Sequence, residues 1–289
     1  MSILEIKNLS YKYGVGTPFE IAAIDNINFS VEKGEMVAII GHTGSGKSTL
    51  IQHFNALLKP SEGQILLDGK DINESRETAH KARFRVGLCF QYPEYQLFES
   101  TVYKDIAFGP SNMGLDKTEI DRRVRRAAEF VGLKESMFEK SPFDLSGGEK
   151  RRVAIAGVMA MEPEVLIMDE PAAGLDPRGR KVILDLIKNY REKTGSTVII
   201  VSHSMEDVAS VADRIIVLNK GKIAFNDSVD EVFSHEKELR EIGLNIPQIT
   251  KIFAELKKYG FNLRSDVYTV EDAAAEILRY LHKGGIGND

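Results

Sequence analysis

The sequence predicts an α/β protein with a mostly parallel core sheet, an antiparallel β edge, a helical subdomain and a small α-rich C-terminal domain. Short apolar runs alternate with amphipathic stretches along the chain, a pattern typical of strands and helices packed in layers. Continuous apolar runs, which are typical of strands buried on both faces, occupy residues 36–40, 165–168 and 197–201. The sequence contains no internal repeat or low-complexity tract, which argues against a solenoid or a disordered tail.

Composition narrows the class of protein further. The chain has 289 residues, of which 43% are hydrophobic and 28% charged, ordinary values for a globular protein in water. A net charge of −5 argues against a protein that coats nucleic acid. No apolar run approaches the roughly 18–20 residues that span a bilayer, and the first residues lack the pattern of a signal peptide. The one cysteine, Cys89, fits a reducing cytosol, and we expect it to be a small buried side chain.

Elements of the first half follow from local patterns. Segments 3–9 and 24–31 alternate apolar and polar residues, which predicts antiparallel edge strands with one face in water. Apolar periodicity predicts a helix over residues 50–58, and residues 115–143 are predicted to be helical and charged. Four arginines of that second region are expected on a solvated face: Arg122, Arg123, Arg125 and Arg126.

The character of the chain changes after residue 225, which divides it into a main domain of residues 1–225 and a C-terminal domain of residues 226–289. Apolar residues at helical spacing predict one helix that ends at Gly260: Ile246, Ile249, Phe253, Leu256 and Tyr259. A capping-box pattern over 269–272 predicts a second helix, whose apolar residues are Ala273, Ile277, Leu278 and Leu281. About 60 residues cannot hold a large core alone, so we expect this domain to pack on the main domain or on a partner.

A glycine-rich loop follows the buried run 36–40 and precedes a helix, as a phosphate-binding loop of the form G-x-x-x-x-G-K-[ST] requires. Its residues are Gly41, His42, Thr43, Gly44, Ser45, Gly46, Lys47, Ser48 and Thr49. The glycines let backbone N–H groups surround phosphate oxygens at a helix N-terminus. We expect Lys47 to bridge the β- and γ-phosphates of a nucleotide and the Ser48 hydroxyl to bind Mg²⁺.

The apolar run 165–168 ends in two carboxylates. Asp169 would reach the Mg²⁺ shell from the end of a strand, and Glu170, one residue further on, would polarise the attacking water. An apolar strand that ends in Asp-Glu is weak evidence alone, but together with the phosphate-binding loop it predicts nucleotide hydrolysis.

Another pattern with two adjacent glycines stands at the start of a further predicted helix. Ser146, Gly147 and Gly148 stand in Leu-Ser-Gly-Gly-Glu, just before Lys150-Arg-Arg152, and form a second candidate anion-binding element. With this motif the sequence resembles the ATP-binding cassette (ABC) ATPases over residues 1–225, with a helical and signature region at about 92–160. The resemblance implies a P-loop NTPase fold, ATP and Mg²⁺ as cofactors, and a signature in one subunit that covers ATP held by another.

The resemblance also implies roles for single residues. Tyr13 matches the aromatic residue that stacks on adenine, with Tyr11 as the competing candidate, and Gln91 matches a glutamine that senses nucleotide and metal. Asp176 matches the end of the D-loop, although it is also well placed to cap a helix that begins near Pro177. His203 matches the switch histidine of the family.

Two positions depart from the family pattern. Glu149 stands where glutamine is commoner in the signature, and Ala173-Gly174 replaces Ser-Ala at the start of the D-loop. Both positions make secondary contacts, so they bear on the rate of hydrolysis rather than on nucleotide binding. We expect a hydrolysis-competent site.

Several ABC classes are disfavoured. The chain has one cassette rather than two, and the stretch between Gln91 and the signature shows no heptads for a long coiled coil. A transporter motor remains, which must dock on a separate membrane protein because the sequence shows no membrane span. Segments 14–20, 41–46, 90–98 and 171–177 more closely resemble the ATPase subunits of energy-coupling factor (ECF) importers, specifically the second of two unlike ATPases.

That closer resemblance implies three partners: a similar second ATPase, a transmembrane coupling subunit and a membrane protein that captures a vitamin or a metal ion. It implies a location at the cytoplasmic side of the cell membrane and a C-terminal segment that helps to hold the ATPase pair. The aromatic residues of 92–98 fit a groove for a coupling helix, or alternatively fill the local core. Two alternatives remain open: the ATPase of a conventional cobalt, nickel or amino-acid importer, and a soluble ATP-gated regulator.

Overall fold

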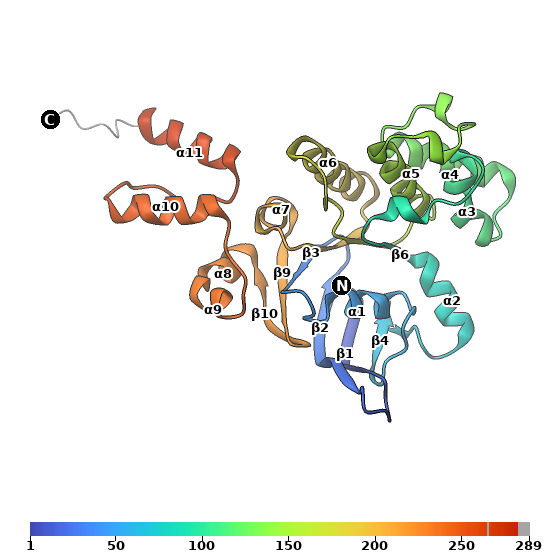
Figure 1. The fold of residues 1–289 in the computed structure, drawn as a ribbon, viewed down its shortest axis with the longest axis horizontal. Helices are drawn as coiled ribbons and strands as arrows, with labels where there is room; N and C mark the ends of the chain where they lie inside the picture. The colour runs from blue at the N-terminus through green and yellow to red at the C-terminus, as the bar shows by residue number, and fades with distance from the viewer. Residues whose placement is uncertain (265, 283–289) are drawn as a thin grey trace.

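A mixed sheet of continuous apolar strands forms the centre of the protein. The computed structural model describes residues 1–264 and 266–282, and over these residues the central sheet has the strand order β10-β9-β3-β8-β7-β6 (Figure 1). The bounds of its strands are β3 Met36–Ile40, β6 Val86–Cys89, β7 Val165–Asp169, β8 Thr197–Val201, β9 Arg214–Asn219 and β10 Lys222–Ser228. The three apolar runs expected to be strands are therefore β3, β7 and β8, and all fifteen of their residues are buried.

Parallel pairing brings the carboxyl ends of neighbouring strands to one edge of the sheet. β3 pairs in parallel with β8 on one side and with β9 on the other, while β7 pairs in parallel with β8 and with β6. Ile39 lies opposite Val201, and Val201 lies opposite Asp169. The loops that follow β3, β7 and β8 therefore begin side by side.

The two N-terminal strands are antiparallel, as expected, but they belong to a sheet of their own. β1 (Ser2–Tyr13) pairs with β2 (Ile21–Glu32) and with β4 (Glu62–Leu67), and β5 (Lys70–Asp71) completes the order β2-β1-β4-β5 within the described chain. Their inward side chains form one core cluster with β3 and with the helix after it. This second sheet thus lies against one face of the central sheet.

The described helices lie around the two sheets, and α6 and α7 pack directly on the central sheet (Figure 1). Their bounds are α1 Lys47–Phe54, α2 Arg76–Arg85, α3 Val102–Asn112, α4 Lys117–Phe130, α5 Gly147–Met159, α6 Pro177–Thr194, α7 Met205–Val211, α8 Val229–Ser234, α9 Glu236–Glu241, α10 Gln248–Lys258 and α11 Val270–His282. The helix expected over 50–58 is α1, which begins and ends earlier. It stops at Asn55 because the next residue, Ala56, has a left-handed φ of 55°.

Helices α3, α4 and α5 form the expected helical subdomain at one end of the molecule (Figure 1). The charged region expected to be helical over 115–143 contains α4 and short 3-10 turns instead of one long helix. Arg122, Arg125 and Arg126 have side chains that are 43–47% exposed, as expected. Arg123 corrects the expectation: its side chain is 15% exposed because it pairs with Glu119 and donates to a backbone carbonyl.

The C-terminal segment divides between two cores. β10 runs to Ser228, beyond the expected boundary at residue 225, and α8 and α9 pack on the main domain in the same cluster as β9. Helices α10 and α11 instead pack on each other, away from the central sheet (Figure 1). Their small shared core contains Phe253, Leu263, Val267 and Ala273. Ile246, expected within the first helix, precedes α10, and the hydroxyl of Thr269 caps α11 by accepting from the N–H of Asp272.

We predict that Phe253→Ala unfolds α10 and α11 locally while the main domain stays folded. Phe253 is 2% exposed and is the largest side chain of that small core. Removing a buried phenylalanine costs about 3–5 kcal/mol, which so few apolar contacts cannot offset. Hydrogen exchange should show lost protection over residues 248–282 alone. The neighbouring Ile252→Ala is the control, because Ile252 is 52% exposed, and equal loss in both variants would contradict the prediction.

Candidate functional site

A cleft of about 920 Å³ opens at the carboxyl edge of the central sheet. Thirteen of the residues that the sequence singled out line it together: Tyr13, Gly41, His42, Thr43, Gly44, Gly46, Lys47, Ser48, Thr49, Gln91, Asp169, Glu170 and His203. They come from β1, from the loop after β3, from the first turn of α1 and from the ends of β6, β7 and β8 or the residues just after them. The parallel register described above is what brings these distant segments to one place.

The glycine-rich loop is held tightly against its surroundings. Gly46 has a φ of 103°, and a Cβ at this position would lie 2.6 Å from the carbonyl oxygen of Ala23, so only glycine fits. Helix α1 begins at the next residue, Lys47, and points its N-terminus into the cleft. The free N–H groups and the dipole at this end favour an anion such as a phosphate.

Lys47 supplies the positive charge of the loop. Its Nζ donates to the carbonyl oxygens of Gly41 and His42, at 2.7 and 3.0 Å. Burial lowers the pKa of Lys47, while Glu170 and Asp169 oppose that shift. The ammonium thus lies between the loop and the two carboxylates, where a nucleotide phosphate would meet it.

Ser45 differs from the other loop residues. It is fully buried, its N–H donates to the carbonyl of His42, and its carbonyl accepts from the N–H of Gly221. The backbone of Ser45 therefore ties the loop to the segment behind it, and Ser45 is not among the residues that line the cleft.

Two adjacent carboxylates follow β7. Ser48 Oγ lies 3.5 Å from Asp169 Oδ2, and Gln91 lines the same cleft. Burial raises the pKa of Asp169 to about 6, and the nearby charge of Glu170 adds to this shift. A hydroxyl, a side-chain amide and a carboxylate supply the oxygen ligands that Mg²⁺ prefers. These three residues therefore fit a magnesium ion bound with a nucleotide.

Glu170 and His203 form a direct contact. Glu170 Oε2 lies 2.8 Å from His203 Nδ1, and the Glu170 side chain is 12% exposed whereas that of His203 is 70% exposed. Glu170 adopts a left-handed φ of 50°, an uncommon conformation for a residue with a side chain. A carboxylate held by an imidazole beside bound phosphates is suited to accept a proton from water.

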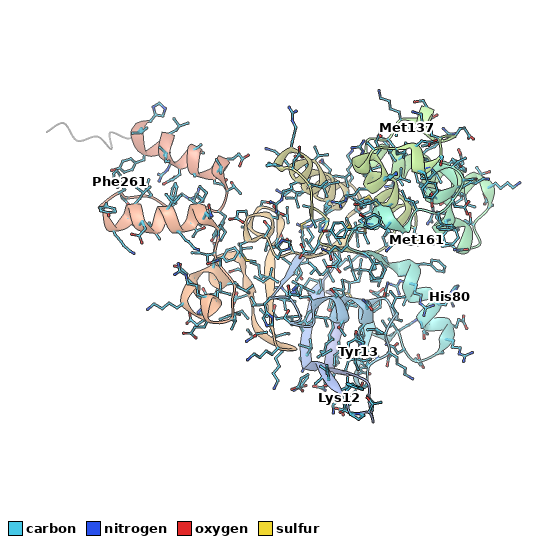
Figure 2. The ribbon with its side chains drawn as sticks, in the orientation of Figure 1. Lys12, Tyr13, His80, Met137, Met161 and Phe261 are labelled. Carbon is cyan, nitrogen blue, oxygen red and sulfur yellow. The ribbon has the colours of Figure 1, made fainter. Side chains whose placement is uncertain are left out.

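Tyr13, and not Tyr11, lines the cleft. Tyr13 is 44% exposed, and its hydroxyl lies 3.2 Å from Thr49 Oγ1 at the start of α1. Tyr11 instead packs edge-on against the buried His53. Figure 2 shows Tyr13 beside Lys12 near the end of β1. The geometry thus favours Tyr13 as the platform for a base.

The signature residues lie elsewhere on the chain. None of Ser146, Gly147, Gly148 and Asp176 lines the cleft; Gly148 and Asp176 line a separate hollow of about 220 Å³. Ser146 Oγ accepts from the N–H of Glu149, and the Glu149 carboxylate accepts from the N–H of Ser146 in return. The family departure at Glu149 therefore forms a capping box at the start of α5. Asp176 caps α6 through the N–H of Gly179, at 2.7 Å.

The sequence did not indicate that the C-terminal segment borders the cleft. Gly243, Leu244 and Asn245 line it beside Met205. Leu244 packs in one core cluster with Met205, and the N–H of Gln248 donates to Glu206 at 3.3 Å, so this loop is fixed to α7. No local pattern could reveal the contact, because it joins segments about 40 residues apart.

Cys89 also follows expectation. It is 3% exposed, and burial raises the pKa of its thiol to about 12. It is therefore a packing residue behind the cleft.

This combination of a phosphate-binding loop, paired carboxylates and a histidine at the edge of a mostly parallel sheet defines a P-loop nucleotide hydrolase. The family described as "ABC transporter" matches residues 24–173. The energy-coupling factor transporter ATP-binding protein EcfA2 of Caldanaerobacter subterraneus is 54% identical and covers 96% of this chain and 97% of its own length. The EcfA2 of Clostridium acetobutylicum is 53% identical and covers 96% of this chain and 98% of its own length.

Solved structures agree with the sequence relatives. cbiO1 of Clostridium perfringens, described as part of the ABC transporter complex cbiONQ, superposes with a TM-score of 0.75 at 41% identity, covering 89% of this chain and 99% of its own. The ATP-binding cassette MJ0796, whose structure is described as dimeric and bound to ADP and Pi, superposes with a TM-score of 0.70 at 29% identity. It covers 78% of this chain and 98% of its own. The chain belongs to the ABC transporter family, as an ATP-binding, ATP-hydrolysing protein of the energy-coupling factor type.

We predict that Tyr13→Ala weakens nucleotide binding by about 5- to 100-fold, because an aromatic–base stack is worth roughly 1–3 kcal/mol. The affinity for a fluorescent ATP analogue measures the effect. Tyr11→Phe is the control, since it keeps the ring that packs on His53. An unchanged affinity in Tyr13→Ala would show that the base binds elsewhere.

Proposed function

We propose that this chain is the motor subunit of an ECF-type importer, in which ATP-driven closure and opening of an ATPase pair drives uptake of a vitamin or a metal ion. One observation carries the proposal: the chain holds a cleft lined by the phosphate-binding loop and, separately, a signature that does not line that cleft. Both elements become useful when two such chains face each other, so that each signature covers the other chain's ATP.

Within the cleft we assign the following roles. Lys47 and the loop N–H groups hold the phosphates, Tyr13 stacks on the base, and Ser48, Gln91 and Asp169 hold Mg²⁺. When bound, the ion neutralises phosphate charge. Glu170 accepts the proton of the attacking water, and His203 orients that carboxylate through their 2.8 Å contact.

In this proposal, removal of the γ-phosphate drives the opening of the ATPase pair. In the closed pair, ATP contacts residues of both chains, and ADP lacks the group that bridges them. This difference in contact free energy shifts the equilibrium between closed and open pairs. The likeness to a dimeric cassette bound to ADP and Pi supports this proposal.

Exposed aromatic side chains gather just after Gln91 in the chain. Tyr95 and Phe98 are 84% and 57% exposed, and Phe98 packs edge-on against Phe108, which is 45% exposed. A shallow groove next to them is lined by Tyr103, Phe108 and Ile120. Exposed aromatic residues next to a groove are typical of a site that grips a partner helix. We propose that a transmembrane coupling subunit docks here and holds the chain at the cytoplasmic side of the membrane.

No helix among the described residues is long and apolar enough to cross a membrane. A separate membrane subunit, together with one that captures substrate, would therefore complete the transporter. The names of the EcfA2 relatives and the description of cbiO1 as part of cbiONQ support this assembly.

The C-terminal helices offer a surface for pairing with a second ATPase. Ile277, Leu278 and Leu281 of α11 are 42–55% exposed, and Val270 is 67% exposed. We propose that this apolar face helps to hold the two ATPases together, alongside ATP. The ATPase of a conventional ABC importer is the second candidate, because cbiO1 is described as part of the ABC transporter complex cbiONQ. A homodimer that hydrolyses ATP steadily without a second ATPase would support it.

We predict that Leu278→Asp together with Leu281→Asp weakens pairing without nucleotide and leaves ATP binding intact. Each substitution places a charge on the exposed apolar face of α11. Sedimentation of the purified ATPase pair measures the change. The buried residues Phe253 and Ala273 of the core that α10 and α11 share stay untouched, so the helix pair itself is preserved. Unchanged pairing would rule out this face as the contact.

We predict that Glu170→Gln lowers ATP hydrolysis by about 100- to 10,000-fold, the usual contribution of a general base, while ATP still binds. The variant should accumulate as a closed pair with ATP, measured by phosphate release and by size-exclusion chromatography. Glu164→Gln is a matched control, because Glu164 lies just before the other end of β7 and pairs with Arg85. Normal hydrolysis by Glu170→Gln would refute the assignment of the base.

A further inference from the structure

Arg151 is a buried charge that none of the roles above uses. It lies on α5 after the signature, and its side chain is only 4% exposed. Burying a guanidinium is costly unless its N–H groups are paired. The hydrogen bonds of the Arg151 guanidinium therefore indicate its role.

One edge of the guanidinium binds the segment that follows Gln91. Arg151 Nε and Nη2 donate to both oxygens of Glu94, at 3.0 and 2.7 Å. Glu94 lies in the 3-10 helix Pro93–Gln96, and its side chain is 16% exposed. A two-point pairing of this kind fixes the plane of the guanidinium as well as its position.

The remaining edge binds the turn that follows the proposed base. Arg151 Nη1 donates to the carbonyl of Ala173 at 2.7 Å and to that of Pro171 at 3.4 Å. The same turn closes on Glu170, whose carbonyl accepts from the N–H of Ala173 at 3.0 Å. On the other side, the N–H of Glu170 donates to the carbonyl of Val201 at 2.9 Å.

Glu170 needs such support because its backbone is strained. Its left-handed φ of 50° costs free energy and persists only where the surroundings impose it. β8 holds the residue from one side through Val201, and Arg151 holds the turn that leaves it. The direction of the Glu170 carboxylate toward His203 follows from these two constraints.

We propose that Arg151 is a positioning residue for hydrolysis: it fixes the turn after Glu170, and Glu94 fixes Arg151. The inference rests on the proposed role of Glu170 as the base. It also links the Gln91 segment to that base through one side chain, so a displacement of Glu94 moves the turn. Tyr92 reinforces the link, since its ring lies 5.9 Å from the guanidinium carbon and 3.6 Å from where a Cβ of Gly174 would stand.

Lysine cannot replace this arginine. The contacts use three nitrogens of a planar fork to reach a carboxylate and two carbonyls that lie on different segments. An ammonium is a single point with no fixed plane. Arg151→Lys should therefore keep the charge but lose the positioning.

The test measures ATPase kinetics in the assembled ATPase for Arg151→Lys and Arg151→Gln. We expect kcat to fall by about 100-fold, the effect of a misplacement of around 1 Å at a reacting group. KM for ATP should stay near the wild-type value, because the phosphate-binding loop makes no contact with Arg151. A KM that rises in step with the fall in kcat, or full kcat in Arg151→Lys, would overturn the inference.

A double variant separates positioning from folding. Arg151→Gln leaves the Glu94 carboxylate buried without its partner, which destabilises the fold, whereas Glu94→Gln with Arg151→Gln removes both charges. We expect the double variant to regain thermal stability and to keep the low kcat. Recovery of kcat together with stability would show a purely structural role and overturn the inference.

Two further measurements separate this inference from the proposed function. Arg125→Gln, which removes an exposed arginine that pairs with Asp121, should hydrolyse ATP at the wild-type rate. If Glu170→Gln also hydrolyses normally, the proposed base is wrong, and the positioning role falls with it. If Glu170→Gln is inactive while Arg151→Gln keeps full kcat, the positioning role alone is wrong.

Discussion

Parallel pairing of β3, β8 and β7 is the constraint on which the rest of the site depends. Because Ile39 lies opposite Val201 and Val201 opposite Asp169, three loops leave the sheet at the same edge. The phosphate-binding loop thus meets the paired carboxylates and His203, although it lies more than 100 residues before them in the chain. The strands are apolar on both faces, so their register is fixed by burial rather than by any contact within the cleft.

Electrostatics inside the cleft follow from that geometry. Two carboxylates stand next to each other beside one ammonium, and burial raises the pKa of Asp169 to about 6 while it lowers that of Lys47. A bound divalent cation would favour the charged form of Asp169, and a bound phosphate would favour the charged form of Lys47. The same closeness gives Glu170 its contact with His203, so the charges that bind ATP and the group that would hydrolyse it are set by one arrangement.

The sequence predicted the main strands, the loop and the carboxylates because each depends on local physics. A short continuous run of apolar residues favours a buried strand. Glycine is required at position 46 because a Cβ there would lie 2.6 Å from the carbonyl oxygen of Ala23. Expectations were wrong where tertiary contacts override local preference. Arg123 is mostly buried because its side chain donates to the carbonyl of Met161, 38 residues further along the chain, and α1 ends at Phe54, two residues before the left-handed Ala56. The assignment of Tyr13 over Tyr11 also needed the structure, since both aromatic residues lie on β1.

By itself, the sequence identified the candidate chemistry of this protein: a loop with the pattern of a phosphate site, two carboxylates that follow a buried strand, and a second glycine motif at the start of a helix. Only the tertiary structure decided which of these segments lie next to each other. It separates the signature from the cleft, brings Gly243–Asn245 of the C-terminal segment to the rim, and joins Glu94, Arg151 and the turn after Glu170. Local patterns depend on neighbours three or four positions away, whereas these contacts depend on how β-strands and helices far apart in the chain pack, which no short window of sequence contains.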